Sequence, residues 1–159
     1  MNYSKIVPEI LVGLGDETVY EDQTKKKITS VHINLECWFG DDLLWEVPEA
    51  FVTENLKKGL ESSLFTGYVF KNVTLTKDIY FEDNYHLDIP LPTFYWMKVL
   101  GEKGKDDLYI DNFELYASTR IIKFLKDNYK VDNMDIDPER DKFDDFIDKL
   151  ISDGKNKKE

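Results

Sequence analysis

Two histidines are the residues of this sequence whose chemistry could support acid–base catalysis. His86 lies between Asp83 and Asp88, so a carboxylate could polarise its imidazole, whereas His32 lies within an alternating strand pattern. A Ser-His-Asp hydrolase also needs a nucleophile within reach of the histidine, and the chain has no Gly-x-Ser-x-Gly turn. We therefore interpret His86 as a surface histidine and expect no catalytic residue, with an enzyme kept as the third possibility.

Pairs of aspartates are the candidates for metal binding. Asp41-Asp42 and Asp106-Asp107 could offer oxygen ligands to a hard cation, but adjacent carboxylates in turns more often bond to the backbone. Residues 132–137 carry acids at alternate positions without the central glycine and final glutamate of a calcium loop. The chain also lacks a phosphate-binding glycine loop and a dinucleotide fingerprint. We predict no metal site and no cofactor.

The elements that position these residues include a stretch that occurs twice. Residues 41–60 match residues 106–125 at a constant offset of about 65 positions, without a gap. In each copy a strand-like run reaches a hydroxyl residue that can cap a helix, Thr53 or Ser118, and an apolar helical stripe follows. The match predicts a strand–cap–helix repeat; the alternative is a chance likeness between two strand–helix segments.

The remaining pattern favours an α+β fold. Residues 28–39 alternate between apolar and polar side chains, as a half-buried strand does, and the aromatic run 93–100 predicts a central strand. Asp137-Pro138 is a typical helix start. We predict a single α+β domain over residues 1–137, with an antiparallel or mixed sheet packed by two to three helices. Residues 138–159 should form a C-terminal amphipathic helix and a frayed tail.

Composition narrows the class of partner. The 159 residues are 42% apolar and 14% aromatic, which is enough for a packed core, and the formal charge is −11. So acidic a chain lacks the clustered cations that bind nucleic acid, but it can attract a basic protein. The single cysteine, Cys37, excludes an internal disulfide and lies in an apolar run, so we expect a buried thiol. No signal-peptide core or membrane-spanning run is present, which predicts a cytoplasmic protein without membrane contact.

Acidic and aromatic residues are mixed between residues 77 and 88. Tyrosine and tryptophan are enriched in protein interfaces because they combine contact area with a polar group. Trp45, Tyr95 and Tyr109 look exposed as well, but they lie outside this segment. The sequence thus predicts a partner-binding segment formed by Asp78, Tyr80, Glu82, Asp83, Tyr85, His86 and Asp88.

Several runs resemble the bacterial immunity proteins of polymorphic toxin systems, which are small acidic cytoplasmic proteins encoded beside a toxin. The resemblance spans about residues 28–136. It implies that the chain binds one cognate toxin and blocks it without catalysis. Many such toxins are basic nucleases, so an acidic surface could cover a basic cleft as a phosphate mimic. The runs that carry the resemblance are Cys37-Trp38-Phe39-Gly40-Asp41-Asp42-Leu43-Leu44, Val52-Thr53 with the helix after it, Leu64-Phe65-Thr66-Gly67-Tyr68-Val69-Phe70 and Phe113-Glu114-Leu115-Tyr116-Ala117-Ser118.

The acidic aromatic segment and the C-terminal helix depart from that family pattern. They leave open a second interpretation, in which the chain is a small structural or regulatory module that self-associates through its C-terminal helix. The sequence does not predict an oligomeric state.

Overall fold

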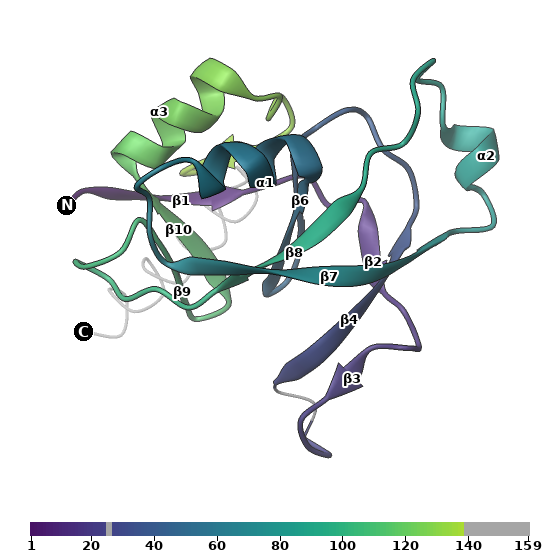
Figure 1. The fold of residues 1–159 in the computed structure, drawn as a ribbon, viewed down its shortest axis with the longest axis horizontal. Helices are drawn as coiled ribbons and strands as arrows, with labels where there is room; N and C mark the ends of the chain where they lie inside the picture. Colours follow the sequence, from purple (N-terminus) through teal and green to yellow (C-terminus); the bar gives the residue numbers. More distant parts are fainter. Residues whose placement is uncertain (25–26, 139–159) are drawn as a thin grey trace, which may run out of the picture.

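The computed structural model describes residues 1–24 and 27–138, which form two β-sheets and three helices (Figure 1). One sheet has the order β11-β1-β10-β9 and consists of β1 (Tyr3–Val7), β9 (Leu108–Asp111), β10 (Glu114–Ser118) and β11 (Asp135–Ile136). The larger sheet has the order β2-β4-β7-β8-β6-β5, with β3 paired to β4. It consists of β2 (Val12–Leu14), β3 (Val19–Tyr20), β4 (Ile28–Leu35), β5 (Leu43–Glu46), β6 (Glu49–Thr53), β7 (Tyr68–Lys77) and β8 (Phe94–Val99). The helices are α1 (Glu54–Glu61), α2 (Phe81–Asn84) and α3 (Thr119–Asn128).

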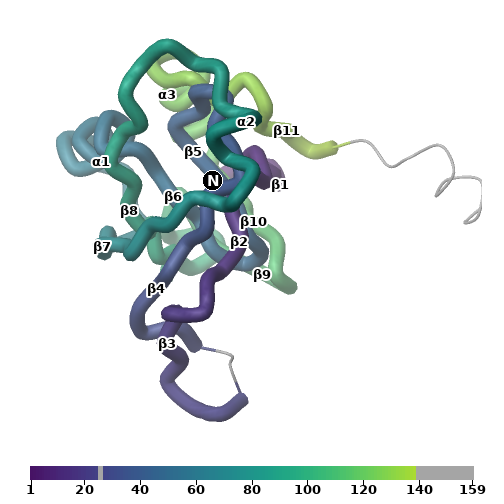
Figure 2. Tube along the Cα trace, turned by 90° about the vertical axis from the view of Figure 1, so that its right-hand side faces the viewer, coloured from purple at the N-terminus to yellow at the C-terminus, as the bar shows by residue number. Residues whose placement is uncertain are grey.

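The larger sheet is mixed. β4 and β7 run parallel, whereas the other neighbours in the sheet pair antiparallel. Its β3 and β4 strands extend away from α1 and α3 (Figure 2). The α+β class, the mixed sheet and the central place of β8 are therefore as predicted. The predicted C-terminal helix lies outside the described residues, apart from Pro138.

Two hairpins lead directly into helices with the same geometry. In β5–β6 Leu43 faces Val52, and in β9–β10 the residues 65 positions later, Leu108 and Ala117, face each other. Thr53 Oγ1 accepts a hydrogen bond from Leu56 N, and Ser118 Oγ accepts one from Ile121 N. Both predicted N-caps are confirmed, and each satisfies an amide of the first turn that has no partner within the helix.

Buried side chains form two clusters on opposite faces of β5, β6 and β8. One cluster lies between the two sheets and includes Leu56 of α1 and Ile121 of α3. The other includes Phe51, Trp96 and Phe81 of α2. Strands that are covered on both faces read as continuous apolar runs, because neither face has to be polar.

The burial of several side chains differs from what the sequence pattern indicates. Trp45 and Tyr109, which looked exposed, are buried, and Trp45 packs in the core between the sheets. His32, on the polar side of its strand pattern, is also buried. Leu64 lies three residues beyond the end of α1 at Glu61 and is 91% exposed.

Candidate functional site

The segment between β7 and β8 is fixed at its base by three residues. The backbone amide of Asp78 donates a hydrogen bond to Leu35 O at 2.9 Å, and the Asp78 carboxylate accepts one from the Tyr80 amide at 3.2 Å. Phe81 is buried in the core and stacks on Tyr85, whose hydroxyl donates to Ile89 O at 2.6 Å. Asp78, Phe81 and Tyr85 therefore position the loop, and α2 is a single turn anchored by Phe81.

The other predicted partner-binding residues lie on the surface of this segment. Tyr80, Glu82, Asp83, His86 and Asp88 are exposed. Glu82 pairs with Lys77 at 3.3 Å, whereas no other described residue forms a hydrogen bond or ion pair with the side chains of Asp83, His86 or Asp88. These three side chains are consequently available to a partner without first breaking an internal contact.

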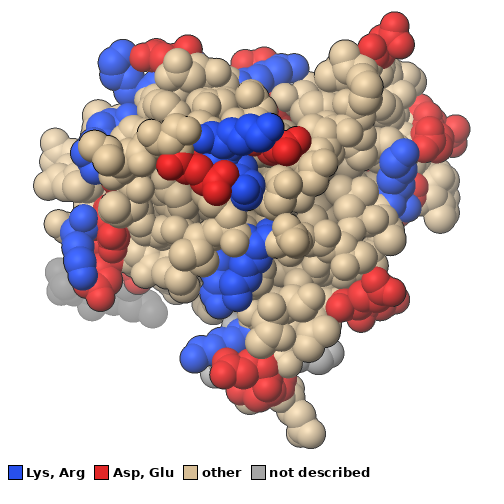
Figure 3. Space-filling model, in the orientation of Figure 1, with Lys and Arg blue, Asp and Glu red and all other residues tan. Residues whose placement is uncertain are grey.

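Apolar side chains accompany these acids. Ile79 is 83% exposed, Tyr80 61% and Ile89 53%. Neither isoleucine belongs to the predicted partner-binding set, because that prediction rested on the acidic residues, the tyrosines and the histidine of the segment. Figure 3 shows acidic side chains around the end of the molecule where Figure 1 places α2. We name residues 78–89 the acidic loop; its surface combines exposed apolar and acidic side chains, a mixture that protein interfaces also contain.

His32 has the most complete polar network on the larger sheet. Its Nδ1 accepts from the Glu17 amide at 3.1 Å, and its Nε2 lies 2.8 Å from Thr76 Oγ1. The Thr76 hydroxyl in turn donates to Asn34 Oδ1 at 3.0 Å. Because Nδ1 is an acceptor, the neutral ring carries its proton on Nε2 and cannot remove the proton of Thr76. The arrangement therefore orders the sheet surface and does not form a Thr–His nucleophile.

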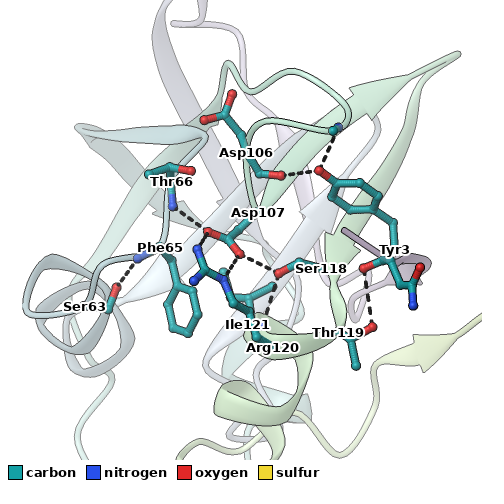
Figure 4. A network of polar contacts seen from close by, with 12 residues as sticks. Tyr3, Ser63, Phe65, Thr66, Asp106, Asp107, Ser118, Thr119, Arg120 and Ile121 are labelled. Carbon is teal, nitrogen blue, oxygen red and sulfur yellow. Dashed lines mark hydrogen bonds and ion pairs between the residues drawn. The ribbon is translucent and has the colours of Figure 1, made fainter.

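The aspartate pairs are hydrogen-bonded to the protein itself. Asp42 Oδ1 accepts from Thr53 Oγ1 at 2.6 Å and Oδ2 from the Lys130 amide at 2.9 Å. Asp107 Oδ1 accepts from Ser118 Oγ at 2.6 Å, and Arg120 binds both of its oxygens at 2.7 and 2.8 Å (Figure 4). These carboxylates bond to the side chains that cap the two helices, and the Lys130 amide is a backbone partner of the kind expected for adjacent carboxylates in a turn.

Burial and hydrogen bonding shift the pKa of the buried carboxyl groups in opposite directions. Burial raises the pKa of Asp107, but hydrogen bonds from Arg120, Ser118 and Thr66 outweigh it, so the net shift is downward. Burial raises the pKa of Glu9, and the charge of Asp41 raises it further. Glu9 Oε2 is buried and has no hydrogen-bond partner among the residues that the structure describes.

A further carboxylate, that of Glu49, lies at the start of β6 in the larger sheet. Burial raises the pKa of Glu49, against the hydrogen bond that Trp96 Nε1 donates to it at 2.7 Å. Glu49 lines a hollow of about 390 Å³ together with Lys27 and Lys98. A perturbed carboxyl group in a cleft is a general signal of a functional site. The mixture of both charges around this hollow does not select one ligand chemistry.

Among residues 1–24 and 27–138, no group of three or more His, Cys, Asp or Glu side chains is arranged to hold a metal ion. None of the helices described there is long and apolar enough to cross a bilayer. No known protein family, no curated protein and no solved structure matches the chain. The acidic loop remains the candidate site, because its exposed apolar and acidic side chains lie together.

Proposed function

We propose that the protein is a non-catalytic inhibitor of the immunity type, which binds one cognate toxin through the acidic loop. The observation that supports this function most is the exposure of Ile79, Tyr80 and Ile89 near Asp83 and Asp88, two acids that form no ion pair with another described residue. Large apolar side chains in solvent are unfavourable for an isolated chain, and a partner that covers them recovers the hydrophobic free energy.

Charge indicates the kind of toxin. The loop carries Glu82, Asp83 and Asp88 on a chain of net charge −11, so a basic cleft is the complementary surface. In this proposal the carboxylates occupy positions that phosphates would take in a nuclease, while Tyr80 supplies the apolar anchor. The chain is cytoplasmic, with no catalytic, nucleic-acid-binding or membrane role.

The two hairpin–helix segments fit this proposal as scaffold. We propose that they are an internal repeat within a single α+β domain, because their strand registers and caps correspond at the offset seen in the sequence. The buried aspartate of each copy, Asp42 or Asp107, is hydrogen-bonded to other described residues, so we assign binding to the loop that neither copy contains.

Co-purification with the product of the adjacent gene tests the proposal. Tyr80→Ala should weaken the complex at least about 30-fold, because buried tyrosines are typical interface hot spots. Asp83→Lys should mainly slow association and reduce its dependence on salt. Leu64→Ala and Glu102→Lys are matched controls, since both residues are exposed and lie outside the loop.

Circular dichroism should show that all four variants remain folded. Complex formation that is insensitive to both loop variants, or that does not weaken as salt rises, would reject the acidic loop as the binding site. Leu64→Ala and Glu102→Lys should bind as the wild type does. Weaker binding of these two controls would mean that any change of the surface disturbs the complex, and not a change in the acidic loop alone.

A further inference from the structure

A second exposed apolar surface lies at the tips of the two hairpins. A hollow of about 180 Å³ opens there, and its floor is formed by the buried residues Ile6, Trp45 and Leu115. Its rim includes Ile10, Val47 and Phe113, each more than half exposed. We name these residues, together with Lys5 and Glu114, the hairpin-tip surface.

The backbone under Phe113 is unfavourable for that residue. Asp111 pairs with Glu114, so Asn112 and Phe113 form a two-residue turn, and their φ angles are +50° and +64°. Such a turn favours Asn-Gly, because glycine adopts positive φ without a steric penalty and a residue with a Cβ does not.

Burial of the Phe113 side chain does not offset this unfavourable backbone conformation, since the side chain is 67% exposed. A glycine at this position would give a better turn and expose less apolar surface. Backbone strain at an exposed aromatic residue is a reason to look for a function of that side chain.

The charges at the rim are balanced. Lys5 Nζ lies 3.4 Å from Glu114 Oε1, and both side chains line the hollow. The hairpin-tip surface therefore has four features. Phe113 projects from it, the hollow is large enough for one aromatic side chain, and Lys5 and Glu114 supply one positive and one negative charge. A two-fold axis places each feature opposite its complement on a second copy, which is the requirement for an isologous interface.

We propose that the hairpin-tip surface pairs two copies of this chain, with Phe113 of each copy inserted into the hollow of the other. Lys5 then faces Glu114 of the partner subunit. The surface is distinct from the acidic loop: α2 lies at the opposite end of the molecule from β9 and β10 in Figure 1, and Figure 2 also separates them. A dimer built this way leaves both acidic loops free, so it does not depend on the proposed function.

Sedimentation equilibrium of the full chain over a range of concentrations tests the pairing. The wild type should show a mass that rises with concentration towards that of two chains, whereas Phe113→Gly should keep the mass of one chain. Glycine suits the turn, so loss of association cannot be attributed to unfolding. Leu64→Gly is the matched control and should associate like the wild type. A wild type that remains monomeric up to about 1 mM, or a Phe113→Gly variant that still dimerises, overturns the proposal.

Charge reversal distinguishes contacts between chains from contacts within one chain. Lys5→Glu and Glu114→Lys should each prevent dimerisation, because each places like charges across the two-fold axis. An equimolar mixture of the two variants should form heterodimers, since both cross-contacts become attractive while each chain's own pair stays broken. Failure of the mixture to associate would refute the arrangement in which Lys5 faces Glu114 of the partner subunit.

Discussion

Replacement of Asp107 by asparagine should produce one of the largest losses of stability available from a single isosteric change in this protein. Each carboxylate oxygen accepts two hydrogen bonds: Oδ1 from Ser118 and Arg120 Nε, and Oδ2 from the Thr66 amide and Arg120 Nη2. The amide group of asparagine would place its own N–H₂ against two donors, whichever way it is turned.

The magnitude follows from the contacts that are lost. Hydrogen bonds that involve a charged group contribute about 1.5–3 kcal/mol each, and two of the four are broken. The Arg120 side chain is 56% exposed and regains water, which reduces the penalty for its unpaired charge. We expect the free energy of unfolding to fall by about 3 kcal/mol, which lowers the urea midpoint by about 1.5 M at a typical m value.

Equilibrium urea unfolding, followed by tryptophan fluorescence, measures this change. Asp42→Asn is the matched control, because Asp42 accepts from Thr53 and Lys130 and has no arginine partner among the described residues. It should lose about half as much. A double-mutant cycle with Arg120→Met isolates the ion pair and should give a coupling of at least about 1 kcal/mol.

The pH dependence gives a second readout. The pKa of Asp107 is lowered in the folded protein, so its stabilising contribution is present above its unfolded pKa and is lost as pH falls through the folded pKa. Asp107→Asn should flatten the acid side of the stability profile. A loss below about 1 kcal/mol, or one no larger than that of Asp42→Asn, would refute the view that Arg120 and Ser118 act together on a buried charge.

Three further changes test separate parts of the structure. Glu9→Gln should raise the free energy of unfolding at pH 7 by about 1 kcal/mol. The pKa of Glu9 is raised in the folded protein, so the wild type loses stability as the pH rises and this carboxyl group becomes charged, whereas glutamine stays neutral. Thermal melts that give the same pH profile for the variant and the wild type would contradict this. Ser118→Ala should lower the free energy of unfolding by about 2 kcal/mol, since it removes both the cap of α3 and a hydrogen bond to Asp107. Ser62→Ala, at an exposed position, is the control, and an equal loss in both variants would count against the prediction. Phe113→Gly should stabilise the monomer by about 1 kcal/mol in urea, and a destabilised variant would show that the turn is not strained.

Sequence patterns predicted the features that depend on local contacts. Thr53 and Ser118 could be assigned as caps because a cap and its helix are adjacent in the chain. The pairing of β3 with β4 was also predictable from a short connection. Burial was harder to predict: Trp45 lies on a strand covered by a core on each face, and His32 is covered because Gly15 lies against its ring.

The residues proposed for the candidate site could be chosen from the sequence, but the contacts that hold them in place could not. The mixture of acidic and aromatic residues pointed to residues 78–88. It did not show that Asp78 and Tyr85 anchor the loop, because their hydrogen bonds to Leu35 O and Ile89 O become visible only in the structure. The significance of Phe113 could not be predicted, because its positive φ becomes apparent once the register of β9 and β10 is known.

The position of β1 has a consequence for synthesis in the cell. Ile6 pairs with Leu115 of β10 on one side and Ile136 of β11 on the other. During translation the first strand must therefore wait for about 110 further residues, roughly 5–20 s at typical synthesis rates, before either neighbour exists. A ribosome that stalls before β10 would release a nascent chain with an unpaired, partly apolar strand near its start, which chaperones and proteases can recognise.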